Sequence, residues 1–260
     1  MTSRKPRFCL GDHLPRRLAV PLFGDRETYG LQPLATDPDW LEWERRAMEI
    51  YLATQTQGLG RIVNQAEYRV MRRVDLAGKQ VLEVGPGSIG HHVYWRSRPA
   101  LYTLADRRQE MLDESRGILE AAGVNIATCL MPEGGRGLPF ADASFDVLVS
   151  FNSFEHLHPF QDYLEEMLRV LKPGGRIVGG IPAEGGLAWG VGRLLTTRRW
   201  FRKHTGIDLD KVICWEHPNF ANTVLAALDA ALACEYRCFW PFRVASIDLN
   251  AVISFVYRKA

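Results

Sequence analysis

The chain has 260 residues, 47% of them hydrophobic and 24% charged, and its net charge at pH 7 is +2. This composition is ordinary for a soluble globular protein with a substantial core, and the small net charge argues neither for nor against a nucleic-acid partner. The five cysteines are odd in number and lack a C-x-x-C pair, which favours reduced thiols in the cytoplasm over a disulfide framework.

The first third of the chain predicts an arm followed by two helices. Residues 1–38 are rich in Pro, Gly and Asp, and we expect them to be irregular. From Asp39 onward, apolar residues recur at helical spacing, and a second helical stretch covers about residues 59–74. No apolar run is long enough to cross a bilayer, and the basic N-terminus lacks the apolar core of a signal peptide.

A glycine-rich turn follows the first predicted strand, residues 79–84. The glycines Gly85, Gly87 and Gly90 fit G-x-G-x-x-G, which is typical of a strand–turn–helix that binds a dinucleotide. Pro86 removes one backbone N–H donor, and the carboxylate of Glu83 would repel a diphosphate but attract a cation. The charges therefore favour S-adenosylmethionine (SAM), which is cationic and has no phosphate, over a nicotinamide cofactor.

The second predicted strand, residues 101–105, ends at Asp106. An acidic side chain at this place in a doubly wound fold accepts hydrogen bonds from both ribose hydroxyls. We expect a helix closed by Gly123 and a third strand over 124–130. Later strands are predicted at about 145–150 and 176–181, followed by a helix at 221–233 and a closing hairpin of residues 236–244 and 251–257.

Several motifs between residues 79 and 181 carry a family resemblance. They resemble those of the class I SAM-dependent methyltransferases, in particular the methyltransferase type 11-like family. The resemblance implies an α/β, Rossmann-like, doubly wound seven-stranded sheet with an antiparallel last strand and helices on both faces. It also implies a division into an N-terminal arm with covering helices (1–75) and a methyltransferase domain (76–260). The motifs are Glu83-x-Gly85-x-Gly87, Leu138-Pro139-Phe140, Ser144-Phe145-Asp146, Glu155-His156-Leu157 and Leu171-Lys172-Pro173-Gly174-Gly175.

The resemblance also implies a set of site residues. Pro132 stands where relatives carry an Asp that meets the adenine, so adenine recognition falls to backbone groups, Glu133 or Met131. For an oxygen nucleophile we expect His156 to be the general base, since imidazole titrates near neutral pH, with His91, His158 and His217 as alternatives. No metal site is predicted. The expected SAM-binding residues are Glu83, Gly85, Gly87, Asp106, Met131, Glu133, Asn152 and Ser153.

Residues from about 182 to 217 form an insertion after the fifth strand. Within it, residues 190–204 hold five formal positive charges and no acid. This segment is interpreted as a lid that binds an anionic group of the acceptor, or as a contact with an anionic membrane surface. Alternatively, it is a solvated helix face balanced by Asp208, Asp210 and Glu216.

The predicted function is transfer of a methyl group from SAM to an oxygen or nitrogen of a small molecule. Candidate acceptors are a sugar, a glycan precursor or another biosynthetic intermediate. RNA methylation and non-catalytic, regulatory SAM binding are the alternatives. The residues after the fourth strand, Ser150-Phe151-Asn152-Ser153, lack the Pro-containing motifs of DNA amino- and cytosine-methylating enzymes, so no DNA partner is expected.

Overall fold

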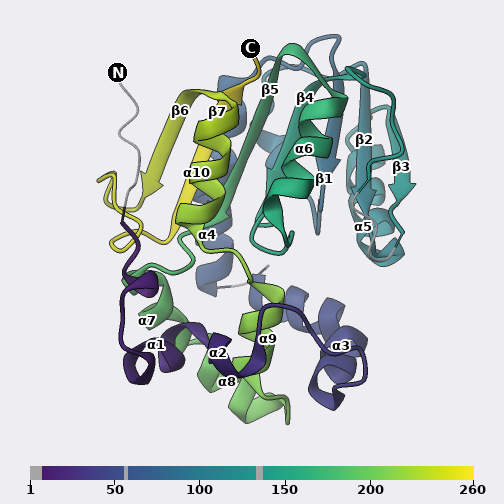
Figure 1. Ribbon diagram of the computed structural model, residues 1–260. Coiled ribbons are helices and arrows are strands. Elements are labelled where there is room, and N and C mark those ends of the chain that lie inside the picture. The colour runs from purple at the N-terminus through teal and green to yellow at the C-terminus, as the bar shows by residue number, and fades with distance from the viewer. Residues whose placement is uncertain (1–7, 56–57, 133–136) are drawn as a thin grey trace.

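A seven-stranded sheet, in the order β3-β2-β1-β4-β5-β7-β6, organises the computed structural model (Figure 1). The structure describes residues 8–55, 58–132 and 137–260. Five neighbouring strands are parallel, and β7 is antiparallel to both β5 and β6. The strands are β1 Gln80–Val84, β2 Leu101–Asp106, β3 Ile126–Leu130, β4 Phe145–Phe151, β5 Leu171–Pro182, β6 Ala233–Trp240 and β7 Val252–Arg258.

Strand order reverses between β1 and β4, because β2 and β3 lie on one side of β1 and the later strands on the other. Loops that leave the carboxyl ends of β1 and β4 therefore diverge and open a crevice, which is where doubly wound sheets bind ligands. Both strands are buried on both faces, consistent with their runs of Val, Leu and Phe. The predicted sheet, with its antiparallel last strand, is confirmed.

Helices cover both faces of the sheet and add a separate layer beyond its strand ends. The α-helices are α1 Arg16–Phe23, α2 Arg26–Tyr29, α3 Pro38–Gln55, α4 Gly58–Tyr68, α5 Gln109–Ala121, α6 Phe160–Val170, α7 Leu187–Leu195, α8 Thr197–His204, α9 Leu209–Glu216 and α10 Ala221–Ala231. The 3₁₀ helices are η1 Leu10–Asp12, η2 Arg69–Arg73 and η3 His91–Tyr94.

Two apolar cores sandwich the sheet. Leu82 faces a core that includes side chains of α6 and α10, which cross the front of the sheet in Figure 1. Its neighbour Val81 faces the other core, which includes Leu112 and Leu119 of α5. Adjacent strand residues point to opposite faces, so a parallel strand with helices on both sides needs apolar residues at every position.

Helices α1–α3 and α7–α9 pack together below the sheet, beyond the carboxyl ends of the parallel strands (Figure 1). We call these six helices the cap. Ile50 of α3, Phe201 of α8 and Ile213 of α9 share one apolar cluster. The N-terminal segment and the insertion of residues 182–217 therefore pack together at the edge where the crevice opens.

Two local predictions are wrong. The glycine turn leads to the single 3₁₀ turn η3 and not to an α-helix, because only ten residues separate Gly90 from β2 and the space beside them is filled by α4 and η2. Residues 8–38 are not irregular, since η1, α1 and α2 form there and bury Leu22 and Phe23. The last part of the expected helix 59–74 is η2, and β5 begins at Leu171, five residues before the expected start of that strand.

The contact of β4 with β5 gives a stability prediction. Gly179 pairs with Ser150, and a Cβ at Gly179 would overlap the Ser150 carbonyl oxygen. We expect Gly179→Ala to lower the free energy of unfolding by about 2–3 kcal/mol in urea titrations, since backbone must shift. The control is Gly117→Ala on α5, where the added Cβ would meet no atom within 4 Å. This substitution should leave the stability unchanged or raise it by up to about 1 kcal/mol. Equal stabilities would contradict the prediction.

Candidate functional site

The glycine turn after β1 is in close contact with side chains of the β4 loop and of α3. Gly85 and Gly87 have φ values of +69° and +55°, which favour glycine over residues with a side chain. A Cβ at Gly85 would overlap the hydroxyl of Ser153, and a Cβ at Gly87 would lie 2.5 Å from the Tyr51 hydroxyl. Tyr51 of α3 also accepts a hydrogen bond from the Ser88 backbone N–H at 3.1 Å. The cap thus reaches the turn directly.

Glu83 lies below the turn and is buried in the sheet. The Nε2 atom of His91 lies 2.9 Å from one carboxylate oxygen, and the Tyr102 hydroxyl donates to the other at 2.8 Å. Trp95 donates to Nδ1 of His91, so Nε2 carries the proton that is shared with Glu83. Both oxygens of Glu83 therefore have protein partners. The role of Glu83 at the amino-acid end of SAM stays a prediction. In that role, the remaining lone pairs of its carboxylate oxygens would accept hydrogen bonds from SAM.

Asp106 lies at the carboxyl end of β2, as expected. One of its oxygens accepts the Arg108 backbone N–H at 2.9 Å, and burial raises the pKa of its carboxyl group. Arg107 and Arg108 form ion pairs with Glu44 of α3 at 3.1 and 2.8 Å, which fixes the loop after Asp106 to the cap. Met131 follows the neighbouring strand, and its N–H donates to the Asp106 carbonyl at 2.8 Å. Glu133 lies outside the described residues.

Asn152 and Ser153 follow β4 and border the turn. Asn152 has a φ of +48°, and its N–H donates to the Gly180 carbonyl at 2.9 Å. Its side-chain amide donates to Glu67 of α4. Glu67 is 1% exposed and its second oxygen has no hydrogen-bond partner. Burial, only partly offset by the Asn152 hydrogen bond, holds the pKa of Glu67 well above its usual range.

Glu67 was missed by sequence reasoning, although a signal was present. It stands at position 67 of an apolar row, Val63, Val70 and Val74, with the spacing of one helix face. An acid in that row is placed against the protein interior. Buried charges are retained only with a partner or a ligand, so such a position indicates a functional group.

His156 lies between two carboxylates. Its Nδ1 is 3.2 Å from Glu216 of α9 and its Nε2 is 3.8 Å from Glu155, and 36% of the ring is exposed. Burial alone would lower the pKa of His156, but the hydrogen bond to Glu216 and the two carboxylate charges raise it to about 9. At neutral pH the ring is therefore an imidazolium. The general-base role stays a prediction, and it requires a pH high enough to remove this proton.

Glu155 differs from Glu216 although both contact the same histidine. Glu155 is 3% exposed and one of its oxygens has no partner. Burial, partly offset by His156, raises its pKa to about 7. Burial also acts on Glu216, but hydrogen bonds from His156 and from Trp43 of α3, together with the His156 and Arg107 charges, lower its pKa to about 2. Glu155 is therefore the carboxylate able to exchange a proton near neutral pH.

Glu184, just after β5, anchors the insertion. It is fully buried and accepts hydrogen bonds from Arg193 and Trp189 of α7, and His217 Nδ1 lies 2.8 Å from it. Burial alone would raise the pKa of Glu184, but Arg193 and His217 hold it well below its usual range. Of the cations in residues 190–204, Arg193 is thus used inside the protein and Arg198 pairs with Asp210.

The predicted residues Gly85, Gly87, Asn152 and Ser153 are brought together. Tyr51 of the cap helix α3 and Glu67 of α4 join them. This edge of the sheet combines a glycine turn with a buried carboxyl group, Glu67, one of whose oxygens has no hydrogen-bond partner. That combination fits a ligand that carries a positive charge, which would supply the missing partner. In the described part of the chain, no three His, Cys, Asp or Glu side chains are grouped as metal ligands.

Comparison with known proteins agrees with this architecture. Residues 82–179 match the family model of a methyltransferase domain. A fatty-acid O-methyltransferase of Mycolicibacterium smegmatis is 34% identical over 125 residues, which cover 47% of this chain and 44% of that protein. A phthiotriol/phenolphthiotriol dimycocerosates methyltransferase of Mycobacterium tuberculosis is 36% identical over 111 residues, 42% of this chain and 39% of that protein. The match thus spans less than half of either relative.

A solved structure extends the likeness of fold. The N-methyltransferase NodS from Bradyrhizobium japonicum, in complex with S-adenosyl-L-homocysteine, superposes with a TM-score of 0.56. The superposition covers 86% of this chain and 99% of NodS, at 18% sequence identity. At that identity the likeness concerns the fold alone.

The His156–Glu216 pair gives a pH prediction. The folded-state pKa of His156, about 9, lies above its ordinary 6.5. The contribution of protonated His156 to the stability of the folded protein is therefore complete below pH 6.5 and is lost as the pH rises through 9. With water screening the exposed third of the ring, we expect the wild-type Tm to fall about 2–4 °C more than that of His156→Gln between these limits. Parallel Tm curves in scanning calorimetry would contradict the pair.

Proposed function

Since this chain carries a class I SAM-dependent methyltransferase domain, we propose that the protein transfers a methyl group from SAM to an oxygen or nitrogen of a small molecule. The observation that carries the proposal is the buried carboxyl group of Glu67, which lies beside Asn152 at the glycine-turn edge of the sheet and keeps one oxygen without a partner. SAM has an ammonium and a sulfonium group. A cation at this place would relieve the desolvation of Glu67, whereas a phosphate would be repelled.

The residues expected to hold SAM divide by the part of the ligand they suit. The backbone at Gly85 and Gly87, with Glu83, Asn152 and Ser153, suits the amino-acid end, and we add Glu67 to this set. The Asp106 carboxylate suits the ribose hydroxyls, and Met131 together with Glu133 suits the adenine. When bound, SAM supplies a methyl group already activated by the positive charge on sulfur. The protein then has to orient the acceptor, exclude water and remove a proton.

For proton removal we propose Glu155 alongside the earlier candidate, His156. A general base is most effective when its pKa lies near the working pH, and the Glu155 pKa of about 7 meets this condition. The His156 imidazolium, with a pKa of about 9, is a base only in alkaline solution. At neutral pH its charge instead favours the ionised form of Glu155, which is 3.8 Å away. In this scheme His156 is a positioning residue.

The acceptor is proposed as a class. The relatives named above are a fatty-acid O-methyltransferase and a phthiotriol/phenolphthiotriol dimycocerosates methyltransferase, and each match covers less than half of this chain. A match of this extent supports a small-molecule acceptor as a class. We retain sugars, glycan precursors and other biosynthetic intermediates beside lipids. An anionic acceptor group would have to meet cations other than Arg193 and Arg198, since both are already paired.

The division of labour within the chain is also part of the proposal. Residues 1–75 would cover the cofactor with Tyr51 and Glu67, and residues 76–260 would form the catalytic domain with the insertion at about 182–217 as a lid. Contacts of α3 with Arg107, Arg108 and Glu216 support this arrangement. We also propose a cytoplasmic location, supported by five cysteines that are all free thiols.

Cofactor binding tests the site. We expect SAM to raise the Tm of the wild type and to bind about 10- to 100-fold more weakly to Asp106→Asn, since hydrogen bonds to a charged acceptor are lost. Asp113→Asn is the matched control, because Asp113 lies on α5 and contacts Arg116 on the surface. Titration calorimetry measures both. Stabilisation by NADH without any response to SAM would overturn the cofactor assignment.

The pH dependence of turnover separates the two bases. If Glu155 accepts the proton, kcat/KM should rise with pH, reach a plateau above about pH 7 and fall at least 100-fold in Glu155→Gln. If His156 is the base, the rise should continue to about pH 9 and disappear in His156→Gln. The measurement uses labelled SAM and an acceptor found by screening sugars, lipids and RNA. A profile unchanged in both variants would reject both assignments.

Two results would favour the alternatives over a small-molecule enzyme. Methylation of RNA but of no small molecule would support the RNA-modifying alternative. If the wild type binds SAM and Asp106→Asn binds it more weakly, but no acceptor class is methylated, the result would support a regulatory SAM-binding protein.

A further inference from the structure

Helix α7 is oriented with its charge inside and its apolar residues outside. Its one charged residue, Arg193, is buried. Its large apolar side chains on the solvent side are exposed: Leu187 by 40%, Val191 by 38%, Leu194 by 37% and Leu195 by 51%. Their spacing of four, three and one residues places them on one helix face. Surface helices normally show the opposite pattern, with polar residues outward.

The orientation of α7 is fixed by its buried side. Arg193 is paired with the fully buried Glu184, and Trp189 donates to the same carboxylate at 2.9 Å. On the same buried side, a Cβ at Gly190 would meet the ring of Phe23 of α1 at 2.8 Å, so the two helices are in tight contact there. Rotating α7 to hide its leucines would break the ion pair and open this contact. The apolar face is therefore held in solvent.

Exposed apolar residues and unpaired cations surround this face. The β6–β7 loop joins the start of α7 through a hydrogen bond from the Leu187 N–H to Asp248 at 3.2 Å, and Leu249 of that loop is 51% exposed. On α8, Arg199, Arg202 and Lys203 are exposed. Figure 1 shows α7 at one end of the molecule, below the β6–β7 loop and next to α1 and α8.

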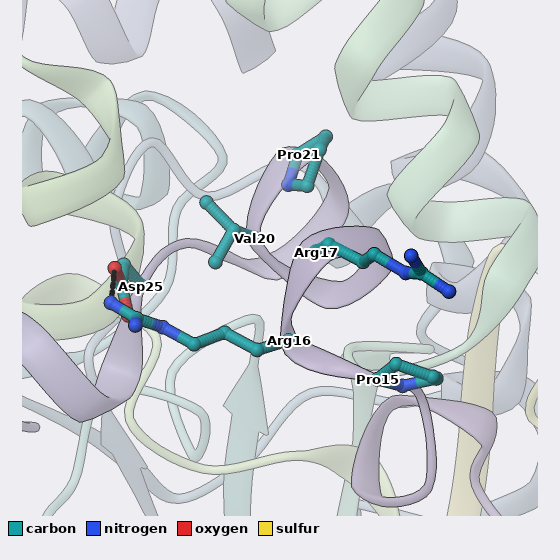
Figure 2. A pocket seen from close by; sticks show the side chains of 6 residues that line it. All are labelled: Pro15, Arg16, Arg17, Val20, Pro21 and Asp25. Atoms are coloured by element: carbon teal, nitrogen blue, oxygen red, sulfur yellow. Dashed lines mark hydrogen bonds and ion pairs between the residues drawn. The ribbon is translucent and has the colours of Figure 1, made fainter.

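Helix α1 adds another cation. Figure 2 shows that Arg16 reaches Asp25, while Arg17 points to the opposite side of the hollow that both line. Among the described side chains, neither Arg17 nor the three cations of α8 has an acidic partner within ion-pair distance. Helices α1 and α8, which both pack against α7, thus add four cations that have no ion-pair partner among the described side chains.

We propose that the outer face of α7, with Leu187, Val191, Leu194 and Leu195, docks onto a lipid bilayer with anionic headgroups. Leucines flanked by lysine and arginine suit the boundary between acyl chains and negative headgroups. In a twofold dimer built on this face, the cations of α8 would approach those of the other copy, which disfavours a second copy as occupant. The face also points away from Glu184, so it does not line the predicted acceptor site.

This inference goes beyond the proposed function and needs no methyl transfer. Among the described helices, none is long and apolar enough to cross a membrane. Contact through four side chains and a few cations should be reversible, weakened by salt and dependent on negative lipid.

Vesicle flotation tests the proposal with the full chain and no substrate. We expect the wild type to float with phosphatidylglycerol vesicles. Its affinity for phosphatidylcholine vesicles should be lower by at least about tenfold. The combined variant Val191→Ser, Leu194→Ser, Leu195→Ser should lose at least about tenfold in affinity. The matched control is Leu34→Ser, Ile62→Ser, Val93→Ser, which removes three apolar residues of 68%, 51% and 67% exposure elsewhere.

A charge variant keeps the test independent of helix packing. Arg199→Gln, Arg202→Gln, Lys203→Gln should weaken binding to phosphatidylglycerol while leaving the Tm within a few degrees of the wild type. Wild-type protein that stays unbound, or equal binding by the wild type and the α7 variant, would overturn the proposal. A dimer in light scattering that is abolished by the α7 variant, without vesicle binding, would overturn it in favour of a second copy.

Discussion

The arrangement of the cap depends on one buried carboxylate. Glu184 ends the loop after β5 with no exposed surface, so its charge must be matched within the protein. Arg193, Trp189 and His217 meet it from α7 and from the residue after α9, which fixes the insertion over the carboxyl ends of the strands. The same pairing turns the only charge of α7 inward. One interaction thus determines both where the insertion of residues 182–217 lies and which face of α7 meets solvent.

Buried acids at this edge of the sheet fall into two kinds, and their surroundings decide their chemistry. Glu184 and Glu216 have cationic partners, which hold their pKa values low, so they remain charged and structural. Glu67 and Glu155 each keep an oxygen without a partner, and burial raises their pKa values. Removing a partner from the first kind would leave an uncompensated charge, whereas the second kind gains from a cation or a proton. The second kind therefore borders the space where ligands are expected.

Much of the sheet could be predicted because its signals are local. Runs of β-branched residues, Gly85, Gly87 and the acid at position 106 each specify a strand or its end within a few residues. The helix expected after the glycine turn was wrong because helices from an earlier part of the chain occupy that face, and no local pattern records this. Glu67 and Glu184 owe their importance to partners 85 and 9 residues away. The cysteine count and net charge said nothing about these pairings.

The N-terminal part of the cap, represented by α3, and the insertion, represented by α7, are attached to the sheet by different kinds of contact. Helix α3 is held by ion pairs from Glu44 to Arg107 and Arg108, whose side chains are 22–44% exposed, and by the Tyr51 hydroxyl at Ser88. Exposed pairs of this kind contribute about 1 kcal/mol or less each. Helix α7 is anchored by the buried Glu184. We therefore expect the contacts of α3 with the sheet to break more readily than those of α7 when a ligand at the glycine turn exchanges.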